Sequence, residues 1–326
     1  MEKCSVQRFL LVTSDDFGYS EERDDGIIEC YKSGAITGAV AMVNGISVAT
    51  GVIKAKQAGM PLDLHMNLTE GLPVGPREGQ YQTLVNEKGM FLGIQGFRDA
   101  VSRGDVDMAE VREEMIVQVQ RFAELTGHTP VKVDGHQHFH THPGIVNVYA
   151  EVLRQHDIKM SRVPLEEGAP LNAYKEFLVN VIEESKRCKN DFQANGIRSP
   201  LFAGLATMGM DMTIKRLQDS ILRAFKSGAT NLNNDQKPTN PALKLRLKSP
   251  RSPAPEEPSV LFCELMTHPG KMTGSKGGCG EGPDLFSQWP DREHEMSILM
   301  SEEMKCFYKR ENIKLISFHD LEVFTE

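Results

Sequence analysis

The stretch FLLVTSDD, residues 9–16, indicates the fold of this chain of 326 residues. Four apolar residues lead into polar ones and two carboxylates, which is typical of a buried strand that ends at a polar site. Seven later stretches have the same apolar start and are predicted strands: 35–45, 60–68, 130–140, 158–165, 199–206, 260–269 and 313–321. Eight such strands favour a (β/α) barrel over a short open sheet.

Segments with helical periodicity separate the predicted strands. In residues 108–127, apolar side chains recur at three- and four-residue steps, at Val111, Met115, Val119 and Phe122, and Gly127 can end the helix. Alternating strands and helices predict an α/β fold with a parallel sheet.

Composition restricts the class of function. The net charge is −8, and 40% of the residues are apolar, which disfavours a nucleic-acid or anionic-membrane partner and fits a globular protein with a sizeable core. No run of about 18 apolar residues predicts a membrane span, and the apolar run 9–12 is too short for a signal peptide. Six cysteines without a Cys-x-x-Cys pair fit reduced, mostly buried thiols of a cytoplasmic protein, with the nucleus as the alternative location.

One segment interrupts the pattern. Residues 231–258 are rich in Pro, Asn, Lys and Ser and contain few large apolar side chains. Such a composition cannot offset its ordering entropy by burial, so we expect a flexible insertion in a single domain of residues 1–326. A Gly-rich stretch at 270–284 is expected to form a loop over the site.

Five predicted strands end in groups that can bind a metal or transfer a proton. The pairs or single residues are Asp15/Asp16, His65/Asn67, Asp134/His136, His268 and His319/Asp320. In parallel α/β folds the carboxyl ends of the strands meet at one end of the sheet, which predicts a shared site there. Each group also has a structural interpretation: the Asp pair could cap a helix, and His268 could cap a strand.

DGHQHFHTH, residues 134–142, contains four of the ten histidines. If it continues as a strand, Asp134 and the four histidines share one face. Residues two apart on a strand are separated by roughly 6.5 to 7 Å, whereas metal–nitrogen bonds are about 2.0 to 2.2 Å. One ion can therefore take one or two of these histidines, and the others would contact substrate or support the ligands. A surface tract that scavenges metal is the alternative.

These residue types favour hydrolysis by a metal-activated water, with an Asp as base and a His as acid. The sequence lacks a Gly-x-Ser-x-Gly elbow and a cysteine beside a histidine in a nucleophile motif, so covalent acyl-enzyme chemistry is the weaker alternative.

Six segments in order resemble the YdjC-type carbohydrate deacetylases, which include the bacterial chitooligosaccharide deacetylases. They are SDDFGYS (14–20), GIIECYKSGAITGAVAMVNG (26–45), LHMNLTEG (64–71), KVDGHQHFHTHP (132–143), SRVPLE (161–166) and ELMTHPG (264–270). The resemblance implies a distorted (β/α) barrel related to the NodB-type polysaccharide deacetylases. It also implies removal of acetyl groups from N-acetylated carbohydrates with a divalent cation, usually magnesium.

The resemblance also assigns roles to residues. It implies Asp15 as the catalytic base and His268 as general acid or oxyanion contact, with Asp16, His65 and His136 as metal ligands. The residues left for substrate binding or for support of the ligands are Asn67, Asp134, His138, His140 and Arg162, of which Arg162 could also orient Asp15. Gln137 stands where the family's usual motif has a histidine.

The donor set leaves the metal open, because an Asp-His-His site also suits zinc, manganese or cobalt. The expected cofactor is Mg²⁺, with Zn²⁺ as the alternative, and the expected partner is an acetylated sugar; a homodimer is compatible with the sequence. Two alternatives to a deacetylase are a metal-binding scaffold without turnover and another metal-dependent hydrolase, such as a glycosidase or phosphoesterase.

Overall fold

A computed structural model describes residues 6–75, 81–166, 168–170, 175–234, 243–248 and 260–325. Its main sheet is entirely parallel, with the strand order β5-β4-β3-β2-β1-β8-β6. The strands are β1 (Gln7–Phe17), β2 (Gly38–Ala41), β3 (Leu62–Met66), β4 (Lys132–Gly135), β5 (Met160–Ser161), β6 (Leu201–Ala203) and β8 (Val260–Thr267). Each of the eight predicted stretches contains a strand, since β9 (Ile313–Leu315) pairs with the first residues of β1.

The sheet curves until its two edges approach each other. A parallel bridge between Met160 of β5 and Arg198 joins the two edges, because Arg198 lies just before β6. Two backbone hydrogen bonds support this bridge, from Ser161 N to Arg198 O at 3.1 Å and from Arg198 N to Lys159 O at 2.8 Å. The expected α/β fold with a distorted barrel is thereby confirmed.

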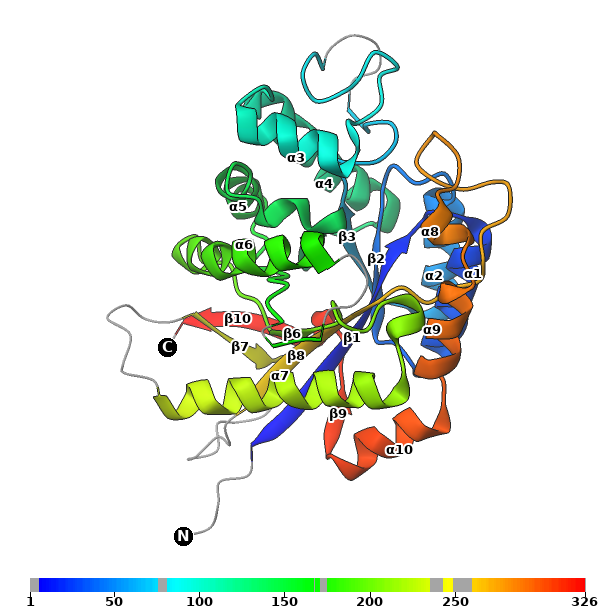
Figure 1. Cartoon of the computed structure of the whole chain (residues 1–326), viewed down its shortest axis with the longest axis vertical. Helices are drawn as coiled ribbons and strands as arrows, with labels where there is room; N and C mark the ends of the chain where they lie inside the picture. Colours follow the sequence, from blue (N-terminus) through cyan, green and yellow to red (C-terminus); the bar gives the residue numbers. More distant parts are fainter. Residues whose placement is uncertain are drawn as a thin grey trace.

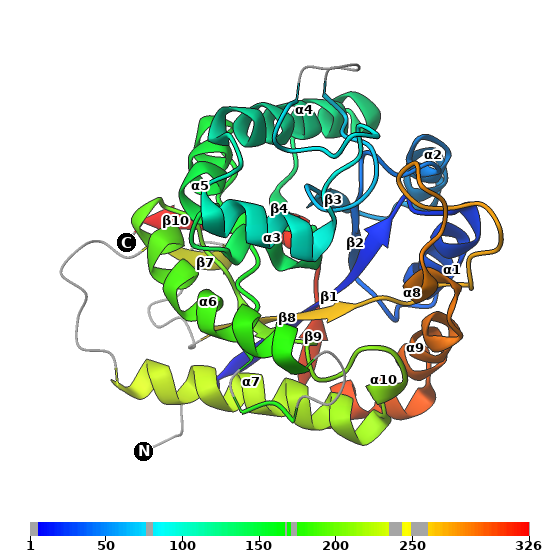
Figure 2. The same ribbon diagram turned by 45° about the horizontal axis from the view of Figure 1, so that its top comes forward.

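Helices surround the sheet in Figure 2 and cover its outer surface (Figure 1). They are α1 (Glu21–Lys32), α2 (Val48–Ala58), α4 (Met108–Thr126), α5 (Val146–Gln155), α6 (Lys175–Ala194), α7 (Ile214–Asn234), α9 (Asp291–Leu299) and α10 (Glu302–Arg310). Helix α4 ends as predicted at Gly127, whose φ of 83° is left-handed. Helix α3 (Gly93–Arg103) lies across the opening of the ring in Figure 2, and α8 (Leu285–Gln288) is one short turn.

Two described parts of the segment 231–258 have regular structure, unlike the expected flexible insertion. Residues 231–234 end helix α7, and β7 (Leu243–Leu247) pairs antiparallel with β10 (Leu321–Thr325). The sequence LKLRL alternates apolar and polar residues, and Leu245 and Leu247 pack on the cluster around Phe9 and Phe318. The remainder of the segment lies outside the described residues, so an insertion in a single domain stays a prediction.

Within the described ranges, every helix is too short or too polar to cross a lipid bilayer. The five cysteines that the structure describes are free thiols, and all but Cys306 are buried, as expected.

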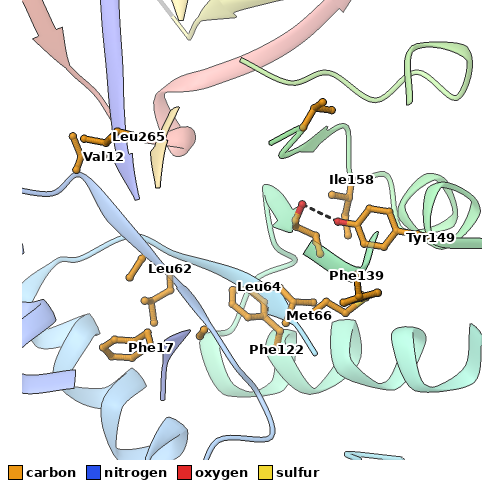
Figure 3. Close-up of a cluster of buried hydrophobic side chains, with 14 of the residues drawn as sticks. Val12, Phe17, Leu62, Leu64, Met66, Phe122, Phe139, Tyr149, Ile158 and Leu265 are labelled. Atoms are coloured by element: carbon orange, nitrogen blue, oxygen red, sulfur yellow. Dashed lines mark hydrogen bonds between the residues drawn. The ribbon is translucent and has the colours of Figure 1, made fainter. Parts of the chain in front are cut away.

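The main core lies between the sheet and the helices. In Figure 3, Leu62, Leu64 and Met66 of β3 point toward Phe17 and Phe122. Nearby, the Tyr149 hydroxyl donates a hydrogen bond of 2.9 Å to the Val133 carbonyl of β4. These contacts fix the strands whose carboxyl ends carry the polar residues.

Leu64→Ala is expected to lower the free energy of unfolding by about 2–5 kcal/mol, because Leu64 is fully buried in this core. Urea denaturation measures the change. The control Ile53→Ala alters a side chain that is 58% exposed and should change stability by less than about 0.5 kcal/mol. Equal losses in the two variants would contradict this placement of the core.

Candidate active site

A bulge at the end of β1 turns Asp15 and Asp16 into the same cavity. Between the pairs Ser14↔Ala39 and Phe17↔Ala41, β1 contains one residue more than β2. Asp16 takes up the extra length in the left-handed conformation, at φ 60°. An ideal strand would direct two adjacent side chains to opposite faces, so this bulge allows both carboxylates to serve one site.

Asp16, His65 and His136 converge as the resemblance implied. Asp16 Oδ1 lies 3.0 Å from His136 Nδ1 and 3.2 Å from His65 Nε2. The two ring nitrogens are 3.3 Å apart, and all three side chains are buried. One carboxylate oxygen and two imidazole nitrogens within this distance could hold a divalent cation.

A second carboxylate sets the tautomer of each histidine. Asp134 Oδ1 accepts from His65 Nδ1 at 2.8 Å, and Glu70 Oε2 accepts from His136 Nε2 at 2.8 Å. The other nitrogen of each ring, which faces Asp16, is then free to donate its lone pair to a metal. Glu70 also hydrogen-bonds Glu281, and burial together with the charge of Glu70 raises the pKa of Glu281 to about 7. The donor set of one carboxylate and two imidazoles fits a bound cation.

The electrostatics of the trio also favour a cation. Burial lowers the pKa of His136, but the charge of Asp16 and the hydrogen bonds to Asp16 and Glu70 outweigh it and raise the pKa to about 10. Burial tends to raise the pKa of Asp16, yet Arg23, at 2.9 Å, and His136 hold it well below its usual value. His136 is therefore protonated at pH 7 in the protein alone, and a metal ion would replace that proton.

The predicted strand of residues 130–140 is shorter in the structure, and it does not continue through the histidines. Strand β4 ends at Gly135, and residues 136–141 form a tight helical turn in which Gln137 (φ 52°) and His138 (φ 56°) are left-handed. The histidines therefore do not share one face. Such conformations cost on the order of 1 kcal/mol or more per residue and persist only where the surroundings impose them.

The histidines of this turn have different surroundings. His136 and His138 line the cavity, whereas His140 turns away from it. His140 accepts a hydrogen bond from Gly135 N and donates one to Arg162 O, and burial lowers its pKa to about 4. His142 contacts Ser102 of α3 at 3.1 Å. His140 and His142 therefore support the turn, whereas His136 and His138 face the cavity.

Arg162 lies below the trio and is fully buried. Its guanidinium donates two hydrogen bonds to Asp15, of 2.6 and 2.7 Å, and two to Glu264, of 2.8 and 3.1 Å. It also lies 2.8 Å from Asp134 Oδ2, next to the buried ammonium of Lys132. Of the two roles that the sequence left open for Arg162, these contacts fit orientation of Asp15.

His268 faces Asp15 from β8. Its Nε2 is 3.9 Å from Asp15 Oδ2, and Phe286 packs edge-on against the ring. Burial lowers the pKa of His268 to about 3, so the imidazole is neutral at pH 7. It can donate a proton to a leaving group only after it has received one.

Three residues that were expected at the site lie elsewhere: His319, Asp320 and Asn67. His319 is 3.4 Å from Asp63, which precedes the middle of β3. His319 and Asp320 therefore lie at the amino end of the sheet, and the prediction that they join the site is wrong. The reason is that β9 pairs with the start of β1, so its end lies far from the other strand ends. Asn67 does not line the cavity; its carboxamide accepts from the backbone of Thr69 and Glu70 and shapes the turn that carries Glu70.

A cavity of about 380 Å³ opens above these residues, a size within the range of small-molecule sites. Its lining combines polar residues with five apolar side chains: Phe177, Leu178, Met208, Met266 and Phe286. Ile94 and Gln95 of α3 also line the cavity. The Gly-rich segment expected as a loop over the site is anchored beside it, since Gly278 N donates to Tyr19 O and Asp284 lines the cavity.

Sequence reasoning did not assign Glu70, Arg23, Glu264 or Lys132 to the site. Glu70 follows His65 in the polar stretch LHMNLTEG, which was a weak signal. Glu264 and Lys132 are charged residues inside apolar strands, and such positions indicate an ion pair inside a barrel. Arg23 is in a helix and carried no signal.

The chain is similar to known proteins over most of its length. A family model described as YdjC-like protein matches residues 9–310. A carbohydrate deacetylase of Danio rerio is 38% identical over 318 residues, which are 95% of this chain and 97% of that protein. A carbohydrate deacetylase of Homo sapiens is 35% identical over 323 residues, covering 96% of this chain and 91% of that protein.

A solved structure has the same fold. It is the crystal structure of a proposed cellobiose-phosphate cleavage protein of Enterococcus faecalis V583, with a TM-score of 0.62 and 19% sequence identity over 96% of this chain and 98% of that one. With the family match over most of the chain, these findings show that the chain belongs to the YdjC family.

Proposed function

We propose that this protein is a metal-dependent carbohydrate deacetylase that hydrolyses the acetamide of an N-acetylated sugar. The observation that carries the proposal is the convergence of Asp16, His65 and His136 beside Asp15 in one cavity. The similarity to proteins named carbohydrate deacetylases, over nearly their full length, supports the reaction class.

Asp16, His65 and His136 would hold the cation, for which Mg²⁺ follows from the family resemblance and Zn²⁺ fits the two imidazoles. When bound, a divalent cation supplies a Lewis acid that polarises a carbonyl and lowers the pKa of water. Asp134 and Glu70 would keep the two imidazoles in the orientation that binding requires.

Asp15 is the proposed base. Arg162 fixes both of its oxygens, yet each carboxylate oxygen keeps a second lone pair, and Asp15 lines the cavity next to His65. Asp15 would accept a proton from the attacking water. His268, 3.9 Å away and neutral, would take up that proton and deliver it to the departing amine.

The cavity supports a sugar as substrate. A pyranose has apolar C–H faces and a polar rim of hydroxyls, and the cavity is lined both by apolar side chains, among them Phe177 and Phe286, and by polar ones. His138 and other polar lining groups would contact the hydroxyls of the substrate.

An acetate-release screen tests the function. The metal-stripped protein is incubated with N-acetylglucosamine, its oligomers and other N-acetylated sugars, and Mg²⁺, Zn²⁺, Mn²⁺ or Co²⁺ is added back. We expect acetate from at least one sugar, only when a metal is present. Release of a sugar or phosphate instead of acetate would support another hydrolase, and equal activity without metal would contradict the metal site.

Asp15→Asn is expected to lower kcat by about 10²–10⁴-fold, because the base is lost, while metal affinity stays within about twofold since Asp15 is not one of the three proposed ligands. Steady-state acetate release and calorimetric metal titration measure the two effects. Asp219→Asn, on the exposed face of α7, serves as a control that should retain activity. Full activity of Asp15→Asn would refute the assignment.

Glu70→Gln is expected to weaken metal binding by about 10–100-fold, because the neutral amide no longer holds the His136 imidazole as a basic ligand. A competition titration with a chelating dye gives the affinity. The matched variant Glu124→Gln changes an exposed carboxylate of α4 and should bind metal like the wild type. Equal affinities for the two variants would show that Glu70 does not support the metal site.

A further inference from the structure

Three consecutive side chains, those of His136, Gln137 and His138, line the same cavity. An extended backbone would direct the middle one away from its neighbours. Here Gln137 and His138 are both left-handed, at φ 52° and 56° with ψ 25° in each case, a conformation that bulky side chains rarely adopt. The strained turn therefore brings the Gln137 carboxamide to the cavity beside a proposed metal ligand.

Two polar atoms of this turn have no hydrogen-bond partner among the residues that the structure describes. Gln137 Oε1 is buried and accepts no hydrogen bond from any described residue, and the same is true of His138 Nδ1. His138 is 6% exposed. Buried polar groups are nearly always hydrogen-bonded, so these atoms call for partners that enter through the cavity.

A structural role does not account for Gln137. A residue that only had to connect β4 to the following turn would be a glycine, which adopts the left-handed region without strain. The side chain adds an unsatisfied amide at the cavity instead of a bond that secures the turn. Strain and unsatisfied polar groups coincide where a ligand supplies the compensating interaction.

We infer that Gln137 determines substrate specificity, and that its carboxamide hydrogen-bonds a hydroxyl group of the sugar ring that carries the reacting acetamide. A carboxamide matches a hydroxyl because both can donate and accept, and the unpaired Oε1 needs a donor. The position of Gln137 directly after His136 places this contact next to the reacting group. The inference rests on the proposed function for the identity of the ligand.

The test compares Gln137→Gly with Asn312→Gly. Asn312 is exposed and left-handed, at φ 50°, in the loop before β9. Both changes relieve a left-handed residue but also raise the entropy of the unfolded chain, so the melting temperature should change little. Gln137→Met, which keeps the length of the side chain without its amide, provides a second variant. KM and kcat come from acetate release, and metal affinity and sugar binding to the metal-free protein come from calorimetry.

We expect KM to rise about tenfold in both Gln137 variants, because each loses one hydrogen bond to the substrate. In the same variants kcat should stay within about threefold of the wild type, and metal affinity should not change. Asn312→Gly should have wild-type values throughout. A KM within twofold of the wild type in both Gln137 variants overturns the inference and leaves the proposed function intact. A parallel loss of metal affinity also overturns it, because Gln137 would then act through His136.

The remaining outcomes separate the two proposals. If the wild type binds N-acetylglucosamine oligomers without hydrolysing them, and the Gln137 variants bind about tenfold more weakly, the proposed function fails and this inference stands. If the wild type neither binds nor hydrolyses these sugars, both are overturned.

Discussion

The buried guanidinium of Arg162 is the interaction on which the site depends. It joins three carboxylates from three strands, Asp15 of β1, Asp134 of β4 and Glu264 of β8. Together with Lys132 it offsets negative charge that could not otherwise be buried in the barrel. The carboxylates attract protons and cations to the site. Arg162 holds the Asp15 side chain in place, and Asp134 holds the His65 side chain.

Left-handed residues at the ends of two strands place several functional side chains in the cavity. At the end of β1 a bulge with left-handed Asp16 places two adjacent carboxylates in one cavity, and after β4 two left-handed residues place three adjacent side chains there. Regular strands would have sent half of these side chains into the surrounding helices. The density of functional groups is therefore obtained through local backbone strain, which the packed barrel maintains.

The fold could be predicted because apolar runs and helical periodicity are local properties. The eight strand positions, the end of α4 at Gly127 and the convergence of Asp16, His65 and His136 all agree with the expectation. The errors come from non-local effects. The strand pairing of β9 removed His319 and Asp320 from the site, and β7 pairs with β10, whose Glu322 lies 76 residues after its partner Arg246.

The sequence by itself determined the alternation of strands and helices, and which residue types lie at the strand ends, because side-chain hydrophobicity follows the period of each element. Only the tertiary structure decided which of the histidines faces the cavity, that Glu70 supports His136, and that Arg162 binds Asp15. These features depend on backbone angles at single residues and on pairings between distant strands. Neither is set by local composition, because each is stabilised by contacts that exist only when the barrel has formed.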